Sequence, residues 1–352
     1  MTITLNEVMT SAMGLIRERK LSEATAVIQN GLQSKPPGRP RRPLREVVDI
    51  LRLKKPPAYD FDAVPQSGNV AWREMPEGVR MLSRSFSCAA GQRNYKLYIP
   101  GNTTGKKRPL LIMLHGCTQN PDDFAAGTRM NALAESSGML VAYPGQSKAA
   151  NPSACWNWFD PKDQRRSAGE PSIIAGLTQE IMAAHNVDPA RVFIAGLSAG
   201  GAMAVIMGAT YPELYTAIGV HSGLPYRSAS DVVSAFAAMR GDSRSVMPTA
   251  PKRTIVFHGD ADRTVHASNG MHIAGEEHRE NTAAFAATQN ASAGGRAYTR
   301  TVTRDRDGLP AVEHWLIHGG GHAWSGGSPA GSFTDPQGPD ASSEMVRFFL
   351  AP

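Results

Sequence analysis

The sequence predicts an α/β fold in which helices cover both faces of a mostly parallel central sheet. From about residue 78 onward, short apolar runs alternate regularly with segments of helical length, and this alternation is typical of repeated strand–helix units. The run "PLLIMLHG" is apolar almost throughout, as expected of a strand that is buried on both faces. A chain of 352 residues is long enough for one large domain of this kind and an appendage.

The expected elements follow one another along the chain. An antiparallel pair of strands, 79–88 and 93–100, opens the domain. Apolar runs then predict strands at 109–116, 139–144, 191–196, 217–223 and 253–259, with two more around Tyr298 and Val312. The segments between and after these strands predict helices at 122–137, 171–185, 199–211, 231–239, 267–288 and 341–350.

The first 77 residues differ from the rest of the chain. Apolar residues recur at helical spacing within residues 1–33, with the polar "RERK" between two such stretches, which predicts a small helical hairpin. Residues 34–77 are expected to form a linker, because the prolines of "SKPPGRPRRP" remove hydrogen-bond donors and stop helix formation. The main domain is then expected to span residues 78–352, and the hairpin is a candidate element for homodimerisation.

The positive charge of the chain is concentrated in this linker. Eight basic and two acidic residues lie between residues 35 and 55, and they account for the whole formal charge of +6. The rest of the chain is formally neutral, so no nucleic-acid partner is expected. No run approaches eighteen apolar residues, so no membrane span is expected. The first twenty residues lack the pattern of a secretory signal, which makes a cytoplasmic location the default expectation.

The stretch "GLSAG" places Ser198 between two glycines at the G-x-S-x-G spacing. The apolar run before it predicts a strand, and the small residues after it predict a helix. A serine on such a sharp strand-to-helix turn is exposed at the end of the sheet, and small neighbours are needed because the helix passes close to the strand. Ser198 is therefore the predicted nucleophile.

A serine hydroxyl needs a base to activate it and an acid to orient that base. In α/β-hydrolases the chain order is serine, acid, histidine. Asp262 in "HGDADRTV" follows an apolar strand and is the predicted acid, with Asp260 as the alternative that caps the loop. His322 in "GGGHAWSGG" follows three glycines and is the predicted base, whereas His318 is expected to remain with the preceding strand.

Acyl transfer also needs hydrogen-bond donors for the oxyanion that develops on the carbonyl oxygen. The backbone N–H of Ala199 follows the nucleophile directly and is one predicted donor. The loop after the early buried strand, "LHGCTQ", supplies the other, for which the N–H of Cys117 is the candidate. This chemistry requires neither a cofactor nor a metal ion, and none is expected.

With "LHGCTQN", "CWNWFD", "GLSAGGAM", "HGDADRTV" and "GGGHAWSGG" in this order, the chain resembles the polyhydroxybutyrate depolymerase family of esterases, which are α/β-hydrolases related to feruloyl and acetylxylan esterases. The resemblance covers about residues 80 to 350. It implies the α/β-hydrolase fold and the same five site residues. It also implies a serine carboxylesterase that hydrolyses short-chain hydroxyalkanoate esters or oligomers through an acyl-enzyme. Feruloyl- or acetylxylan-type esters and amide cleavage by the same fold stay open as alternatives.

The resemblance also implies a disulfide between Cys117 and Cys155. Disulfides persist in oxidising compartments, so this expectation conflicts with a cytoplasmic location and favours a secreted or periplasmic one as the alternative.

Aromatic side chains are expected to line the acyl pocket. Trp156 and Trp158 in "CWNWF" and Trp324 beside the predicted base fall in irregular segments on the side where a substrate approaches, and His115 precedes the predicted oxyanion loop. These four are the predicted substrate-binding residues. The alternative for the tryptophans is that they fill the core of the loops.

Overall fold

The computed structural model describes residues 78, 80–101, 105–242, 253–275, 286–305 and 307–351. The predicted hairpin (1–33) and linker (34–77) lie outside the described residues, so the three-part division of the chain stays a prediction.

Ten strands form one central sheet among the described residues. Its order is β1-β2-β4-β3-β5-β6-β7-β10-β9-β8. The strands are β1 Arg80–Cys88, β2 Gly91–Ile99, β3 Arg108–Leu114, β4 Leu140–Pro144, β5 Val187–Leu197, β6 Ala217–His221, β7 Arg253–Gly259, β8 Ala286–Ala293, β9 Arg296–Arg304 and β10 Pro310–Ile317. A second, parallel pair consists of β11 Trp324–Ser325 and β12 Thr334–Asp335.

The middle of the large sheet is parallel. Each neighbouring pair from β4 through β3, β5, β6 and β7 to β10 runs in the same direction. The edges are antiparallel, with β1 and β2 on one side and β9 and β8 on the other. The carboxyl ends of β3, β5, β6, β7 and β10 therefore lie at one edge of the sheet, which is where open α/β sheets hold their ligands.

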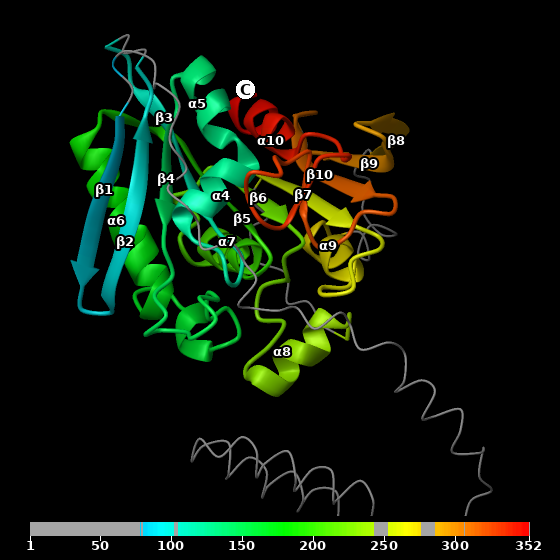
Figure 1. Ribbon diagram of the computed structural model, residues 1–352, viewed down its shortest axis with the longest axis horizontal. Helices are drawn as coiled ribbons and strands as arrows, with labels where there is room; N and C mark the ends of the chain where they lie inside the picture. Colours follow the sequence, from blue (N-terminus) through cyan, green and yellow to red (C-terminus); the bar gives the residue numbers. More distant parts are fainter. Residues whose placement is uncertain are drawn as a thin grey trace, which may run out of the picture. The chain divides into compact units, whose positions relative to one another are not determined.

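Helices cover both faces of the sheet (Figure 1). On one face lie α6 Gly169–Ala184 and α7 Ala199–Thr210, and on the other lie α4 Pro121–Thr128, α5 Met130–Ser137 and α10 Ala341–Leu350. The side chains of β3 alternate between the two cores, with Leu110, Ile112 and Leu114 toward α6 and α7 and Leu111 and Met113 toward the opposite helices. Shorter elements are η1 Pro161–Gln164, α8 Val232–Met239 and α9 Ser268–Ile273. This arrangement is the predicted α/β-hydrolase architecture.

The single helix predicted at 122–137 is in fact two helices. Arg129 adopts a left-handed conformation (φ 53°) between α4 and α5. Its guanidinium donates to the carbonyl oxygen of Gly326 (2.7 Å) and to Asp340 Oδ2 (3.1 Å), which lie in the C-terminal part of the chain. The chain thus turns at Arg129 to reach these distant partners, which helical periodicity alone does not show.

The helix predicted at 267–288 is also wrong in part. Helix α9 ends at Ile273, and residues 286–288 belong to strand β8, which pairs antiparallel with β9. The turn between them is Gly294–Gly295, and both glycines have positive φ angles (66° and 110°). A Gly-Gly pair is a known hairpin signal because glycine adopts positive φ without steric cost, so the sequence does carry a local signal for this hairpin.

Candidate active site

The predicted nucleophile lies on a strained turn between β5 and α7. Ser198 has φ 57° and ψ −120°, a combination that costs free energy for any residue with a Cβ. Its N–H donates to the carbonyl oxygen of His221 (2.9 Å) on the neighbouring strand. A Cβ at Gly200 would lie 2.1 Å from the Leu114 carbonyl oxygen, and one at Gly196 would lie 2.4 Å from that of Gly200. Both flanking positions therefore require glycine, as the motif predicts.

The predicted acid and base are in direct contact. Nδ1 of His322, on the loop after β10, is 2.7 Å from Oδ2 of Asp262, on the loop after β7. The other carboxylate oxygen, Oδ1, accepts the N–H groups of Thr264 and Val265 (both 2.8 Å). The Asp262 side chain is fully buried, and that of His322 is 13% exposed. A carboxylate oxygen at Nδ1 fixes the imidazole so that its Nε2 is the atom left for a substrate proton.

A second histidine lies beside Asp262. His258 is the penultimate residue of strand β7 and is fully buried. Its Nε2 is 3.6 Å from Asp262 Oδ2 and 2.9 Å from the Val265 carbonyl oxygen. Burial alone would raise the pKa of Asp262, but the two neighbouring histidines and the backbone N–H groups lower it well below its usual range. Asp262 is therefore a carboxylate at neutral pH.

His221 connects the loops of the predicted nucleophile and base. Its carbonyl oxygen accepts the N–H of Ser198, and its Nε2 accepts the N–H of Ser325 (3.0 Å), three residues after His322. The ring is fully buried and stacks on Phe257 and Trp324. Burial lowers the pKa of His221 to about 3, so the imidazole is a neutral acceptor at neutral pH.

The alternative pair, Asp260 and His318, lies elsewhere. Nδ1 of His318 is 2.9 Å from Asp260 Oδ2, and Nε2 of His318 is 2.9 Å from the hydroxyl of Thr299 on β9. Asp260 Oδ1 accepts the N–H of Gly319 (2.7 Å), as expected of a residue that caps the loop. His318 itself is 41% exposed rather than packed within the strand.

The predicted oxyanion loop follows β3 and lies next to Ser198. A Cβ at Gly116 would lie 3.6 Å from the Cβ of Ser198. The N–H of Gly116 donates to Gln119 Oε1 (2.9 Å), and that of Thr118 donates to the Ser153 carbonyl oxygen (2.8 Å). These bonds occupy the donors on either side of Cys117, whose own N–H stays the predicted oxyanion donor of this loop. The N–H of Ala199 opens helix α7, where the first-turn N–H groups have no partner within the helix.

Gln119 connects this loop to the chain after the predicted base. Its side chain is buried, and Nε2 donates to Asp123 Oδ2 (2.9 Å) and to the Ser332 carbonyl oxygen (3.1 Å). Ser332 in turn donates to both carboxylate oxygens of Asp123. The oxyanion loop and the loop that follows His322 are thus joined by one polar cluster.

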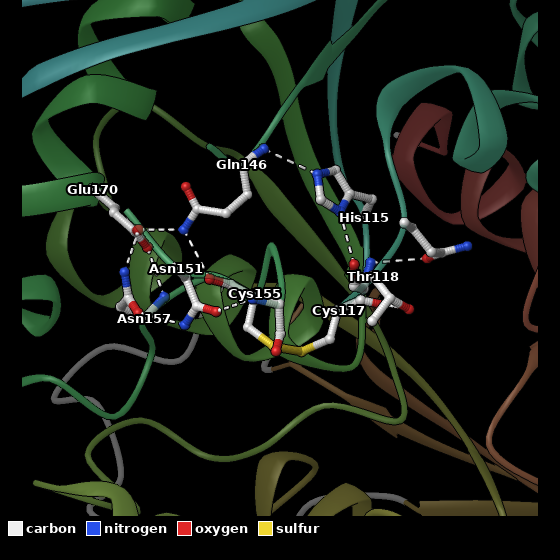
Figure 2. Close-up of a disulfide and its surroundings, with 11 residues drawn as sticks. His115, Cys117, Thr118, Gln146, Asn151, Cys155, Asn157 and Glu170 are labelled. Carbon is white, nitrogen blue, oxygen red and sulfur yellow. Dashed lines mark hydrogen bonds between the residues drawn. A yellow bond between two sulfur atoms is a disulfide. The ribbon is translucent and has the colours of Figure 1, made fainter. Parts of the chain in front are cut away.

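The disulfide between Cys117 and Cys155 is present, as the resemblance implied. Figure 2 shows it below His115 and Gln146. It connects the oxyanion loop to residues 151–157, which are held by further hydrogen bonds, such as that between the side chains of Asn151 and Asn157 (2.9 Å). Cys88, the free cysteine of the described residues, is exposed.

Glu170 organises the polar cluster beside the disulfide (Figure 2). It lies at the start of α6, is almost fully buried, and accepts the backbone and side-chain N–H groups of Asn157 (2.8 and 2.9 Å). Gln146 Nε2 and Arg93 also donate to it. Burial raises the pKa of Glu170, and these donors oppose that change. A buried carboxylate with four donors holds its surroundings in one arrangement.

Three of the four predicted substrate-binding residues are core residues. Trp156 is fully buried, Trp324 is 1% exposed with its N–H donating to Ser342 Oγ (3.0 Å), and His115 is 1% exposed. Burial of this degree favours packing over direct substrate contact for these three residues, in line with the loop-packing alternative for the two tryptophans, and their part in substrate binding stays a prediction. Trp158 is 6% exposed, and its contact with substrate stays a prediction.

The surroundings of the predicted site contain polar residues that the motifs did not reveal, namely His221, His258, Gln119, Gln146 and Glu170. A signal existed for two of them. His221 is the last residue of β6 and His258 the last but one of β7, each after an apolar run. A histidine at the carboxyl end of a parallel strand lies at the site edge of the sheet.

One cavity borders the edge of the sheet formed by β1 and β2. It measures about 990 Å³ and is bordered by the β1–β2 pair, Pro121 and residues 145–147. Its lining includes none of the predicted catalytic residues.

Within the described ranges, no cluster of three His, Cys, Asp or Glu side chains is arranged to hold a metal ion. No helix in that part of the chain is long and apolar enough to span a membrane.

Comparison with known proteins identifies relatives along most of this domain. A model of the family described as esterase PHB depolymerase matches residues 93–297, more than half of the chain. Poly(3-hydroxyalkanoate) depolymerase C of Paucimonas lemoignei is 33% identical over 229 residues, covering 61% of this chain and 54% of that protein. Feruloyl esterase B of Neurospora crassa is 27% identical over 220 residues, covering 57% of this chain and 69% of that protein.

A solved structure shows the same fold. The acetyl xylan esterase from Aspergillus awamori superimposes with a TM-score of 0.61 at 18% identity, covering 78% of this chain and 99% of that one. Among the curated relatives, a probable acetylxylan esterase A of Aspergillus fumigatus is 28% identical over 221 residues, covering 57% of this chain and 58% of that protein. The chain therefore spans between about half and two thirds of the length of the curated relatives it matches.

Proposed function

The chain belongs to the esterase PHB depolymerase family, and from this premise we propose that it is a serine carboxylesterase. The observation that carries the proposal is the contact between His322 Nδ1 and Asp262 Oδ2 (2.7 Å) at the same sheet edge as the strained Ser198. A buried carboxylate that orients a histidine, at the same sheet edge as a serine on a strand-to-helix turn, fits the arrangement that activates a hydroxyl for acyl transfer.

The proposed reaction has two halves. Ser198 Oγ attacks the ester carbonyl carbon while His322 Nε2 takes the serine proton, and the N–H groups of Cys117 and Ala199 bind the oxyanion. His322 then returns the proton to the leaving alcohol, which leaves an acyl-enzyme. Water attacks the acyl-enzyme by the same route, and Asp262 stabilises the imidazolium in both halves.

We propose short-chain hydroxyalkanoate esters or oligomers as the substrate class. The support is the family and the relative named poly(3-hydroxyalkanoate) depolymerase C. A feruloyl- or acetyl-ester substrate is the second candidate, favoured by the relatives named feruloyl esterase B and acetylxylan esterase A. Turnover of a soluble 3-hydroxybutyrate oligomer is expected to exceed that of methyl ferulate and of an acetylated xylo-oligosaccharide, and the reverse order would favour the second candidate.

The serine mechanism is tested with a fluorophosphonate probe and the Ser198→Ala variant. The probe is expected to label the wild type at Ser198, and the variant is expected to lose both labelling and ester turnover. Ester turnover that persists in Ser198→Ala, or labelling of another residue, would overturn the assignment. An Asp260→Asn variant is the matched control, because the Asp260 carboxylate contacts His318 and the N–H of Gly319 rather than His322, and its change is expected to leave labelling intact.

We infer that the protein works in an oxidising compartment. The Cys117–Cys155 disulfide supports this alternative over the cytoplasmic default. Alkylation of thiols in intact cells, before lysis, followed by mass spectrometry of the unreduced protein, is expected to leave both cysteines unmodified and Cys88 alkylated. Alkylated Cys117 and Cys155 would contradict the inference.

A further inference from the structure

The peptide unit between Gly116 and Cys117 is held from its carbonyl side. The Gly116 carbonyl oxygen is 2.7 Å from Nδ1 of His115, and it also accepts the N–H of Gln119 (3.3 Å). The C=O and N–H of a trans peptide are coplanar and point in opposite directions. Whatever holds this carbonyl therefore also sets the direction of the Cys117 N–H, the proposed oxyanion donor.

The hydrogen bonds of His115 determine its tautomer. Nε2 accepts the N–H of Gln146 (3.0 Å), so Nδ1 carries the proton and donates to the Gly116 carbonyl oxygen. The ring is 1% exposed and packs against Trp156 with ring centroids 5.9 Å apart. Burial lowers the pKa of His115 to about 4. Its ring is therefore neutral at any pH at which the catalytic histidine is neutral enough to act as a base.

Gln146, the partner of His115, is itself fixed. Its side-chain Nε2 donates to the Cys155 carbonyl oxygen (2.8 Å) and to the buried carboxylate of Glu170. Cys155 is bonded through its sulfur to Cys117. Figure 2 shows these residues as one continuous group from Glu170 through Gln146 to His115, with the disulfide beside them. The peptide unit that carries the Cys117 N–H is thus held on one side by His115 and on the other by the disulfide.

We propose that His115 is a positioning residue of the oxyanion hole, which holds the Gly116 carbonyl so that the Cys117 N–H points at the developing oxyanion. This inference rests on the proposed serine esterase function. The bond to the carbonyl also polarises the same peptide unit, which strengthens its N–H as a donor. His115 acts through the peptide and makes no contact with substrate, in agreement with its burial.

The test compares His115→Phe with His115→Asn. Phenylalanine keeps a ring against Trp156 but has no donor, whereas the asparagine amide nitrogen is bonded to Cγ as Nδ1 is and can donate to the Gly116 carbonyl oxygen. Loss of a whole oxyanion donor typically lowers the rate about 100- to 1,000-fold. A donor that points in the wrong direction still gives part of the transition-state stabilisation, so a smaller loss is expected. We expect kcat to fall about tenfold to a hundredfold in His115→Phe with KM within about twofold, and His115→Asn to recover most of kcat.

Inhibition by a boronic acid gives a second readout, because its tetrahedral adduct with serine places an oxygen in the oxyanion hole. Affinity for the boronic acid is expected to fall in parallel with kcat in His115→Phe and to recover in His115→Asn. A wild-type kcat in His115→Phe, or a His115→Asn variant no better than it, would overturn the inference. Failure of the proposed function is distinguishable, because the wild type itself would then not be labelled at Ser198.

A measurement on the wild type keeps the inference testable if neither variant folds. In protein labelled with ¹⁵N, the imidazole nitrogen shifts of His115 report which nitrogen carries the proton. The Nδ1–H tautomer is expected between pH 6 and 8. An Nε2–H tautomer would leave no donor toward the Gly116 carbonyl and would overturn the inference.

Discussion

Removal of the Cys117–Cys155 disulfide is expected to lower both stability and activity. The bond joins residues 38 positions apart. In the chain-entropy model, a closed loop of that length restricts the unfolded chain by about 4 kcal/mol at 25 °C. A Cys117→Ser, Cys155→Ser double variant is therefore expected to lose about 4 kcal/mol of unfolding free energy, a substantial part of the stability of an ordinary domain.

The assay is equilibrium denaturation in urea followed by tryptophan fluorescence. The midpoint is expected at a lower urea concentration in the double variant, and reducing agent is expected to lower it in the wild type as well. Cys88→Ser is the matched control, because Cys88 is exposed and forms no disulfide. The urea midpoint of this variant should match that of the wild type. A double variant as stable as the wild type would refute the reasoning.

The same double variant separates stability from catalysis. The hydrogen bond from the Thr118 N–H to the Ser153 carbonyl oxygen (2.8 Å) still connects the two loops without the disulfide. We therefore expect a partial loss, with kcat reduced about tenfold and KM little changed, because only the aim of the Cys117 N–H is relaxed. A rise in KM alone would indicate that the disulfide shapes the substrate pocket instead.

Three further predictions follow from the site. Asp262→Asn is expected to lower kcat by about 10⁴-fold, whereas Asp260→Asn should stay within about threefold of the wild type; equal losses in the two variants would contradict the assignment of the acid. Gly200→Ala is expected to destabilise the fold by about 1–3 kcal/mol and to abolish turnover, because its Cβ would lie 2.1 Å from a backbone oxygen; a thermal melt and an ester assay check this, and a wild-type melting temperature would contradict it. The free energy of unfolding is expected to fall between pH 7.5 and pH 5, because burial lowers the pKa of His115 to about 4 and that of His221 to about 3 in the folded protein. Below the ordinary histidine pKa of about 6.5, both imidazoles are protonated in the unfolded chain but stay neutral in the folded protein down to about pH 5. This difference in proton binding lowers the free energy of unfolding by about 2 kcal/mol per imidazole at pH 5. Urea denaturation at the two pH values measures it, and an unchanged unfolding free energy would rule it out.

Much of the fold could be predicted because it depends on local periodicity. Apolar runs locate the buried strands, and the closing helix was predicted with its observed bounds, 341–350. The missed features depend on long-range contacts or turn chemistry. Arg129 breaks a helix because its guanidinium reaches residues about 200 positions away. The prediction lacks strand β8 because the predicted helix continues past the end of α9 at Ile273 to residue 288, which belongs to β8.

The candidate catalytic residues could be chosen from the sequence because each follows a predicted strand, and parallel strands bring their carboxyl ends to one edge. In the structure, the loops after β7 and β10 meet at this edge and bring Asp262 and His322 into contact. Their catalytic roles stay predictions. The polar residues around them were not found. Gln146, Glu170 and Gln119 belong to segments whose contacts depend on loop conformation, and no local pattern encodes which loops meet.

The predicted and the proposed role of His115 differ for a definite physical reason. A sequence pattern indicates that a residue lies at the site edge of the sheet, but not whether its side chain points to the substrate or into the protein. Both ring nitrogens of His115 are already bonded to backbone groups, and the ring lies against the fully buried Trp156. A polar residue this well satisfied beside a reactive loop contributes by restricting that loop's backbone, since restricting the donor before the reaction removes a reorganisation cost at the transition state. On the proposed role, His115 would hold the predicted oxyanion loop in place, and acyl specificity would then depend on residues that are exposed around Ser198.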